Sequence, residues 1–138
     1  SKATGVPIHI AAHGDLMLPG HVYLAPEGRH LGVERGPRAA VITAPPENNL
    51  CPAVSFLFRS AANVLGNQAV GILLTGMGRD GATELKLMRD KGAITIAQDK
   101  ESSAVHGMPG EAIQLDGATH ILPPDRIVGL LEQLCQRA

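Results

Sequence analysis

The chain has 138 residues, of which 44% are hydrophobic and 18% charged, and its formal net charge is −1 at pH 7. These values suit one globular domain with a buried core and exclude a disordered chain. With 2% aromatic residues and no basic excess, the chain lacks the stacking platforms and the positive field that nucleic-acid binding needs.

Apolar runs fall short of the roughly 20 residues that cross a bilayer, and no signal peptide opens the chain. We therefore expect a cytoplasmic protein without membrane insertion. Cys51 and Cys135 have no metal-ligand spacing, so no metal is expected.

The amino-terminal third alternates short apolar runs with Gly and Pro turns, which predicts strands at 7–12 and 21–25. A β-hairpin is expected to pair 31–34 with 39–43 through a loop of about four residues. The loop 44–52, rich in Pro and Asn, then leads into a helix at about 53–65. One face of this helix carries Val54, Leu57, Phe58, Ala61 and Leu65.

Predicted strands and helices then alternate along the rest of the chain. Strands are predicted at 69–75, 93–97 and 119–122, and helices at 82–91, from about Pro109, and from Pro124. The last helix is expected to bury Ile127, Leu130, Leu131 and Leu134. Strands that are apolar on both faces are typical of a parallel sheet covered by helices on each side. The fold class predicted is α/β: a three-layer, doubly wound, Rossmann-like domain with a mostly parallel sheet and a β-hairpin excursion near the amino end.

The most informative segment is the glycine-rich turn at residues 76–81 (GMGRDG), which lies between a predicted strand and a predicted helix. Such a turn places functional groups at the carboxyl edge of a parallel sheet. As G-x-G-x-x-G, it could hold a dinucleotide pyrophosphate, with Asp99 at the end of the next strand binding a ribose hydroxyl. Asp80 opposes that interpretation, because its carboxylate would repel the pyrophosphate. Alternatively, Asp80 only caps the first turn of the helix that follows it, and the glycines permit a tight turn.

Four blocks of sequence together resemble the CheB-type catalytic domain of chemotaxis receptor methylesterases. They are LPGHVYLAP at 18–26, LLTGMGRDGA at 73–82, GAITIAQD at 92–99 and AVHGMPGEA at 104–112. The resemblance covers about residues 8–135 and corresponds to the carboxyl-terminal part of that catalytic domain, as a single domain over 1–138 without the receiver domain that regulates many members.

The resemblance implies a reaction: hydrolysis of glutamyl methyl esters on methyl-accepting chemotaxis receptors, with glutamine deamidation as a related activity. The family uses a Ser-His-Asp triad and no cofactor. By motif match, Asp80 is the Asp that orients the His, and the backbone N–H of Met77 is an oxyanion donor. His106 lies in a loop that the family places near the site, so a substrate contact is implied there.

The nucleophile and the base of the family have no match in this chain. Ser55, Ser60, Ser102 and Ser103 lack the glycine-flanked turn of a nucleophile. The chain's six histidines, at 9, 13, 21, 30, 106 and 120, include no match to the catalytic His, and His21 is expected to be a structural hydrogen-bonding residue. We therefore expect this chain alone to be inactive and to need the missing upstream part of the catalytic domain. A non-catalytic, truncated or degenerate copy that acts as a binding module is the alternative, and dinucleotide binding is a weaker one.

Overall fold

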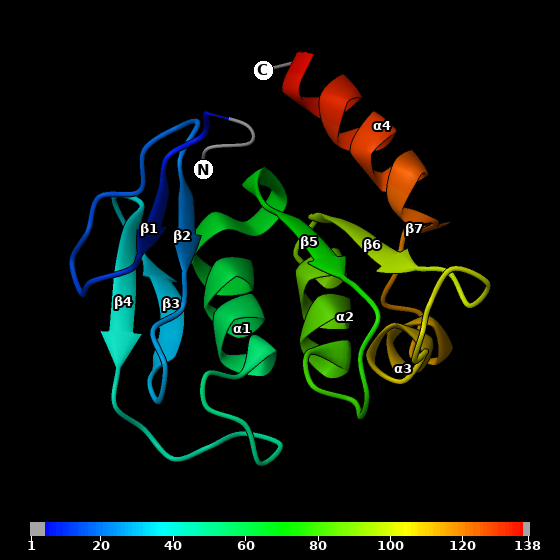
Figure 1. The fold of residues 1–138 in the computed structure, drawn as a ribbon, viewed down its shortest axis with the longest axis horizontal. Coiled ribbons are helices and arrows are strands. Elements are labelled where there is room, and N and C mark those ends of the chain that lie inside the picture. The colour runs from blue at the N-terminus through cyan, green and yellow to red at the C-terminus, as the bar shows by residue number, and fades with distance from the viewer. Residues whose placement is uncertain (1–4, 137–138) are drawn as a thin grey trace.

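The computed structural model describes residues 5–136 and confirms an α/β fold (Figure 1). Its strands are short and fall close to the predicted positions. They are β1 (Ile8–Ile10), β2 (Val22–Leu24), β3 (His30–Glu34), β4 (Arg38–Ile42), β5 (Val70–Leu73), β6 (Ile94–Gln98) and β7 (His120–Leu122). The helices are α1 (Val54–Leu65), α2 (Ala82–Asp90), α3 (Met108–Gln114) and α4 (Pro124–Gln136), with a 3-10 turn η1 (Gly66–Gln68) after α1.

The carboxyl-terminal half forms the predicted parallel sheet, in the order β5-β6-β7. Val70 pairs with Ile94, and Ile96 pairs with His120, so all three strands end at the same edge. The helices α2 and α3 follow β5 and β6 as crossover connections. The turn after β5 and the loop after β6 are thereby brought to one edge of the sheet, where the candidate site lies.

The amino-terminal half forms two smaller sheets. The parallel pair β1-β2 aligns Ile8 with Val22, and the antiparallel hairpin β3-β4 aligns Glu34 with Arg38 across the predicted loop. The hairpin packs one face on α1, and its strands are largely buried. The pair β1-β2, in contrast, leaves a face of four aliphatic side chains exposed, formed by Ile8, Ile10, Val22 and Leu24.

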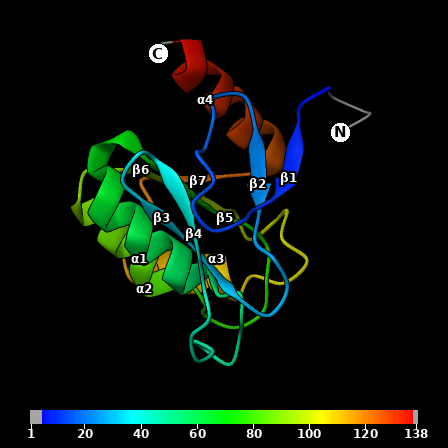
Figure 2. The same cartoon turned by 90° about the vertical axis from the view of Figure 1, so that its left-hand side faces the viewer.

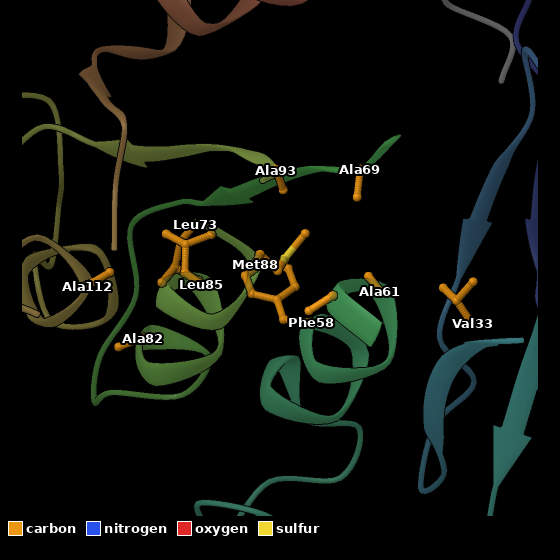
Figure 3. Close-up of a cluster of buried hydrophobic side chains, with 11 residues drawn as sticks. Val33, Phe58, Ala61, Ala69, Leu73, Ala82, Leu85, Met88, Ala93 and Ala112 are labelled. Atoms are coloured by element: carbon orange, nitrogen blue, oxygen red, sulfur yellow. The ribbon is translucent and has the colours of Figure 1, made fainter. Parts of the chain in front are cut away.

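The main core lies between β5 and the helices α1 and α2 (Figure 3). Leu73 of β5, Leu85 and Met88 of α2, and Phe58 and Ala61 of α1 meet there, and Leu85 is fully buried. The predicted apolar face of α1 is confirmed in this contact, with Val54, Leu57 and Leu65 partly buried at its margin. This packing fixes the start of α1 close to the end of β5.

Helix α4 lies on the opposite side of the β5-β6-β7 sheet from α2 and α3, which gives the predicted three layers (Figures 1 and 2). Four residues of α4 were predicted from the sequence to be buried, and only one of them is fully buried. Ile127 is buried, whereas Leu130, Leu131 and Leu134 are only half-buried, because α4 makes few contacts with the other described helices and strands. Within residues 5–136, no helix is long and apolar enough to cross a membrane.

Candidate active site

Asp80 ends the turn after β5, and its carboxylate is buried against the start of α1. Only 3% of the residue is exposed. Its Oδ2 accepts a hydrogen bond from the backbone N–H of Val54 at 2.7 Å, and its Oδ1 accepts one from the N–H of Ser55 at 3.1 Å. The N-cap residue of α1, Ala53, has no side-chain acceptor. Asp80 therefore caps α1 from a distant part of the chain, and the helix dipole favours its negative charge.

The alternative interpretation, in which Asp80 caps the helix that follows it, was wrong. Gly81 is the N-cap residue of α2, and α2 has no side-chain cap. The glycines of the turn have the conformational role that was predicted, because Gly78 and Gly81 adopt φ values of 87° and 84°. A Cβ on Gly81 would also lie 2.6 Å from a methyl carbon of Val54. The absence of a side chain at Gly81 therefore lets the turn pack closely against the first residues of α1, where Asp80 accepts its hydrogen bonds.

Asn48 was missed by the sequence analysis. Its side-chain Nδ2 donates to Oδ1 of Asp80 at 3.0 Å from the loop between β4 and α1. A signal for such a partner was present: a helix that begins at Ala53-Val54 has no capping side chain of its own, so its amides must find an acceptor elsewhere. A cavity of about 320 Å³ opens beside this arrangement, with Asn48, Met77 and Asp80 among its walls.

Met77 lies in the turn after β5, and 82% of the residue is exposed. The two amides that precede Met77 have acceptors: Thr75 N–H donates to Oε1 of Gln98 at 2.7 Å, and Gly76 N–H donates to the carbonyl of Val105 at 2.9 Å. Within residues 5–136, the Met77 amide has no hydrogen-bond partner, and neither have the amides of Gly78, Arg79 and Asp80 that follow it in the turn. An N–H group held in a fixed turn without an internal acceptor is suited to receive an oxyanion.

His106 is brought next to the turn by backbone pairing. Gly76 and His106 form a parallel bridge, in which Gly107 N–H donates to the carbonyl of Gly76 at 3.0 Å. The ring Nε2 of His106 lies 3.0 Å from the carbonyl oxygen of Gln98, and since a carbonyl only accepts, Nε2 carries the proton. A cavity of about 530 Å³ beside the ring is also lined by Lys100 and Glu111. The contact of His106 with substrate stays a prediction.

The serines are engaged in structural hydrogen bonds. Ser55 Oγ donates to Glu47, Ser60 Oγ to the carbonyl of Leu57, Ser102 Oγ to Asp99, and Ser103 Oγ to the carbonyl of Asp99. No hydrogen bond joins a serine hydroxyl to a histidine ring within the described part of the chain, so it holds no assembled nucleophile and base.

Asp99, the acid of the dinucleotide interpretation, is also held locally. Its carboxylate accepts from the hydroxyl and the N–H of Ser102, and these hydrogen bonds lower the pKa of Asp99. The histidine His21 has the structural role that was predicted. Its Nδ1 lies 2.8 Å from Nε2 of His9, and the two rings are stacked with Tyr23.

Comparison with known proteins gives a consistent result. The family model described as CheB methylesterase matches residues 1–131. The chain is 52% identical over 134 residues to a protein of Syntrophus aciditrophicus named protein-glutamate methylesterase/protein-glutamine glutaminase 1, and 56% identical over 132 residues to the enzyme numbered 4 of Geobacter metallireducens. These matches cover 97% and 95% of this chain but 38% of each relative.

A solved structure agrees with the sequence comparisons. The crystal structure of the Thermotoga maritima CheB methylesterase catalytic domain superimposes with a TM-score of 0.80 at 34% identity, over 88% of this chain and 68% of that one. The fold, the motifs and the match over residues 1–131 lead to one conclusion: this chain belongs to the CheB methylesterase family.

Proposed function

We propose that this chain is the part of a protein-glutamate methylesterase that supplies the carboxylate of a Ser-His-Asp triad. Family membership supports the reaction, and the geometry of Asp80 supports the role. Its carboxylate is buried, is held by the amino terminus of α1, and borders a cavity. An acid in a triad has to be fixed in orientation beside the imidazole that it holds. The hydrogen bonds to Asp80 and the cavity beside it fit that requirement.

The serine and the histidine would come from a part of the protein outside this chain. In the proposed reaction, the serine hydroxyl attacks the ester carbonyl of a glutamyl methyl ester while the histidine takes its proton. Asp80 accepts the other N–H of the imidazole, which fixes the tautomer and stabilises the imidazolium. The tetrahedral intermediate expels methanol, to which the histidine returns the proton. Water then hydrolyses the acyl-enzyme by the same sequence, leaving glutamate.

The amide of Met77 is proposed to donate to the oxyanion of the tetrahedral intermediate. It lies in the same turn as Asp80 and has no internal acceptor among residues 5–136. Each oxyanion donor typically contributes about 3 kcal/mol of transition-state stabilisation. Because the donor is a backbone group, its contribution depends on the shape of the turn and not on the Met77 side chain, which is largely exposed.

Methyl-accepting chemotaxis receptors are the proposed substrates, and their glutamine side chains would be deamidated by the same steps with ammonia as the leaving group. His106 is proposed as a substrate contact. It borders the cavity that also carries Lys100, and both lie on the loop after β6, at the sheet edge that presents Asp80. A polypeptide substrate laid along this edge would meet both loops.

The test is a chimera in which this chain replaces the matching 132-residue stretch of the Geobacter metallireducens relative. Methanol release from a receptor cytoplasmic fragment that carries methylated glutamates is measured. The chimera should be active and the chain alone inactive. Asp80→Ala should lower kcat by roughly 10⁴-fold per folded molecule, whereas the exposed Asp90→Ala is the matched control and should keep it. Undiminished turnover of the Asp80→Ala chimera would contradict the assigned role.

A non-catalytic copy is the second candidate, because every serine hydroxyl described above serves a structural hydrogen bond. The coding sequence upstream of Ser1 separates the two candidates. A strand followed by a G-x-S-x-G-G turn there supports the enzyme, and an upstream sequence without it supports a binding module.

A further inference from the structure

The residues around Asn48 form a tight, closed turn. Glu47 and Leu50 exchange both backbone hydrogen bonds, at 3.0 and 2.8 Å, and enclose Asn48 and Asn49. The two asparagines have φ values of 51° and 63°. Positive φ at both central positions is typical of a type I′ turn, the type in which asparagine is favoured. This turn presents the Asn48 side chain to Asp80 from a fixed backbone.

The same turn is anchored on α1. The carboxylate of Glu47 accepts two hydrogen bonds from the guanidinium of Arg59, at 2.6 and 3.1 Å, and one from the hydroxyl of Ser55 at 2.7 Å. The hydrogen bond from Arg59 is the main cause that lowers the pKa of Glu47. Arg59 and Ser55, which hold this carboxylate, belong to α1, the helix whose first two amides donate to Asp80. The turn, the start of α1 and Asp80 therefore form one connected unit.

The two oxygens of Asp80 differ in their partners. Oδ1 accepts from both Asn48 Nδ2 and the N–H of Ser55, at 3.0 and 3.1 Å, and this fills its two lone pairs. Among residues 5–136, Oδ2 accepts a hydrogen bond only from the N–H of Val54 and so keeps one lone pair. If Asn48 were absent, Oδ1 would also have a vacant lone pair. An imidazole could then bind either Oδ1 or Oδ2, and its ring would have a different orientation in each case.

We infer that Asn48 is a positioning residue of the methylesterase: it occupies Oδ1 of Asp80, so that Oδ2 alone is presented to the catalytic histidine. The inference rests on the triad role of Asp80 proposed above. Asn48 touches neither the reacting ester nor the histidine in this scheme and acts through Asp80. Its effect should therefore appear in kcat, with KM nearly unchanged.

The experiment uses the chimera with Asn48→Gly, Asp80→Ala and the double substitution. Glycine accepts the positive φ of Asn48 without strain, so the turn should be retained. Asn49→Gly is the matched control at the second positive φ of the same turn, because Asn49 has no hydrogen bond to Asp80. Asn48→Gly should lower kcat roughly tenfold, as expected for the loss of one hydrogen bond to a charged group. KM should stay within about twofold, and Asn49→Gly should keep kcat within the same factor.

The double substitution separates positioning from a general structural role. In the Asp80→Ala background Asn48 has no carboxylate to hold, so Asn48→Gly should not lower kcat further. An equal loss in both backgrounds, or an Asn48→Gly enzyme as fast as its parent, would overturn the inference while leaving the function intact. A chimera that is folded by circular dichroism but inactive, or that tolerates Asp80→Ala, would overturn the proposed function and the inference with it.

Discussion

Replacing Asp80 with alanine should destabilise the folded chain, independently of any catalysis. The substitution removes the acceptor of three hydrogen bonds: those from the N–H groups of Val54 and Ser55 and from the side chain of Asn48. Removing a helix cap typically costs about 1 kcal/mol, and a hydrogen bond to a charged group contributes about 1.5–3 kcal/mol. The contributions overlap, since all three donors share one carboxylate, and water can replace part of them at the exposed Asn48. We therefore expect a loss of about 2–3 kcal/mol in the free energy of unfolding.

Urea unfolding followed by circular dichroism at pH 7 measures this loss, at two protein concentrations to detect any association. The control is Asp90→Ala. Asp90 forms an exposed i,i+4 ion pair with Lys86 at 2.9 Å, and its removal should change stability by no more than about 0.5 kcal/mol. If Asp80→Ala costs no more than Asp90→Ala, then Asp80 does not cap α1 in solution, and the reasoning that places it there is refuted.

Three further predictions concern the surroundings of the site and the exposed sheet. Because the hydrogen bond from Arg59 lowers the pKa of Glu47, this group stabilises the fold above its ordinary pKa of about 4.3, and the stabilisation is lost as pH falls through the lowered value. Glu47→Gln should cost about 1 kcal/mol at pH 7, and its deficit should shrink as pH falls through the lowered pKa of Glu47. A pH-independent deficit in urea unfolding would contradict this. Gly107→Ala should lower the free energy of unfolding by about 2 kcal/mol or more, since the added Cβ would lie 2.8 Å from the backbone of Gly76 and Gly78. Gly129→Ala is the control: its Cβ would meet nothing within 4 Å, so it should be neutral or slightly stabilising. Equal melting temperatures of the two variants would refute the clash. The isolated chain should associate through the aliphatic face of β1-β2, and Ile10→Lys should reduce that association in light scattering; a monodisperse monomer of the unmodified chain would count against it.

The elements that the sequence predicted well are those with strong local patterns. The helix expected at 53–65 is found at Val54–Leu65, and the strand expected at 93–97 is found at Ile94–Gln98. Their apolar residues recur with the period of one element, and the core formed by Phe58, Leu73 and Leu85 requires that pattern. The burial of α4 was overestimated, because its apolar stripe indicates only that a helix has a face to bury. What covers that face depends on the other elements.

The candidate site was predicted only in part, for a related reason. Asp80 was identified by motif, but its contact with α1 joins residues 26 positions apart and follows from the packing of α1 on α2. Asn48 lies in a loop whose polar residues are typical of any connection. Its link to Asp80 depends on the turn geometry, which the sequence indicates only through two adjacent asparagines.

The capping of α1 by Asp80 has a consequence for how members of this family are told apart. A copy that had lost its serine and histidine would still need a carboxylate at position 80, because the first turn of α1 has no other acceptor in the described structure. Selection for folding alone would then preserve the aspartate long after the chemistry had gone. The acid is therefore a marker of the fold, and the presence of a working enzyme has to be diagnosed from the nucleophile and the base.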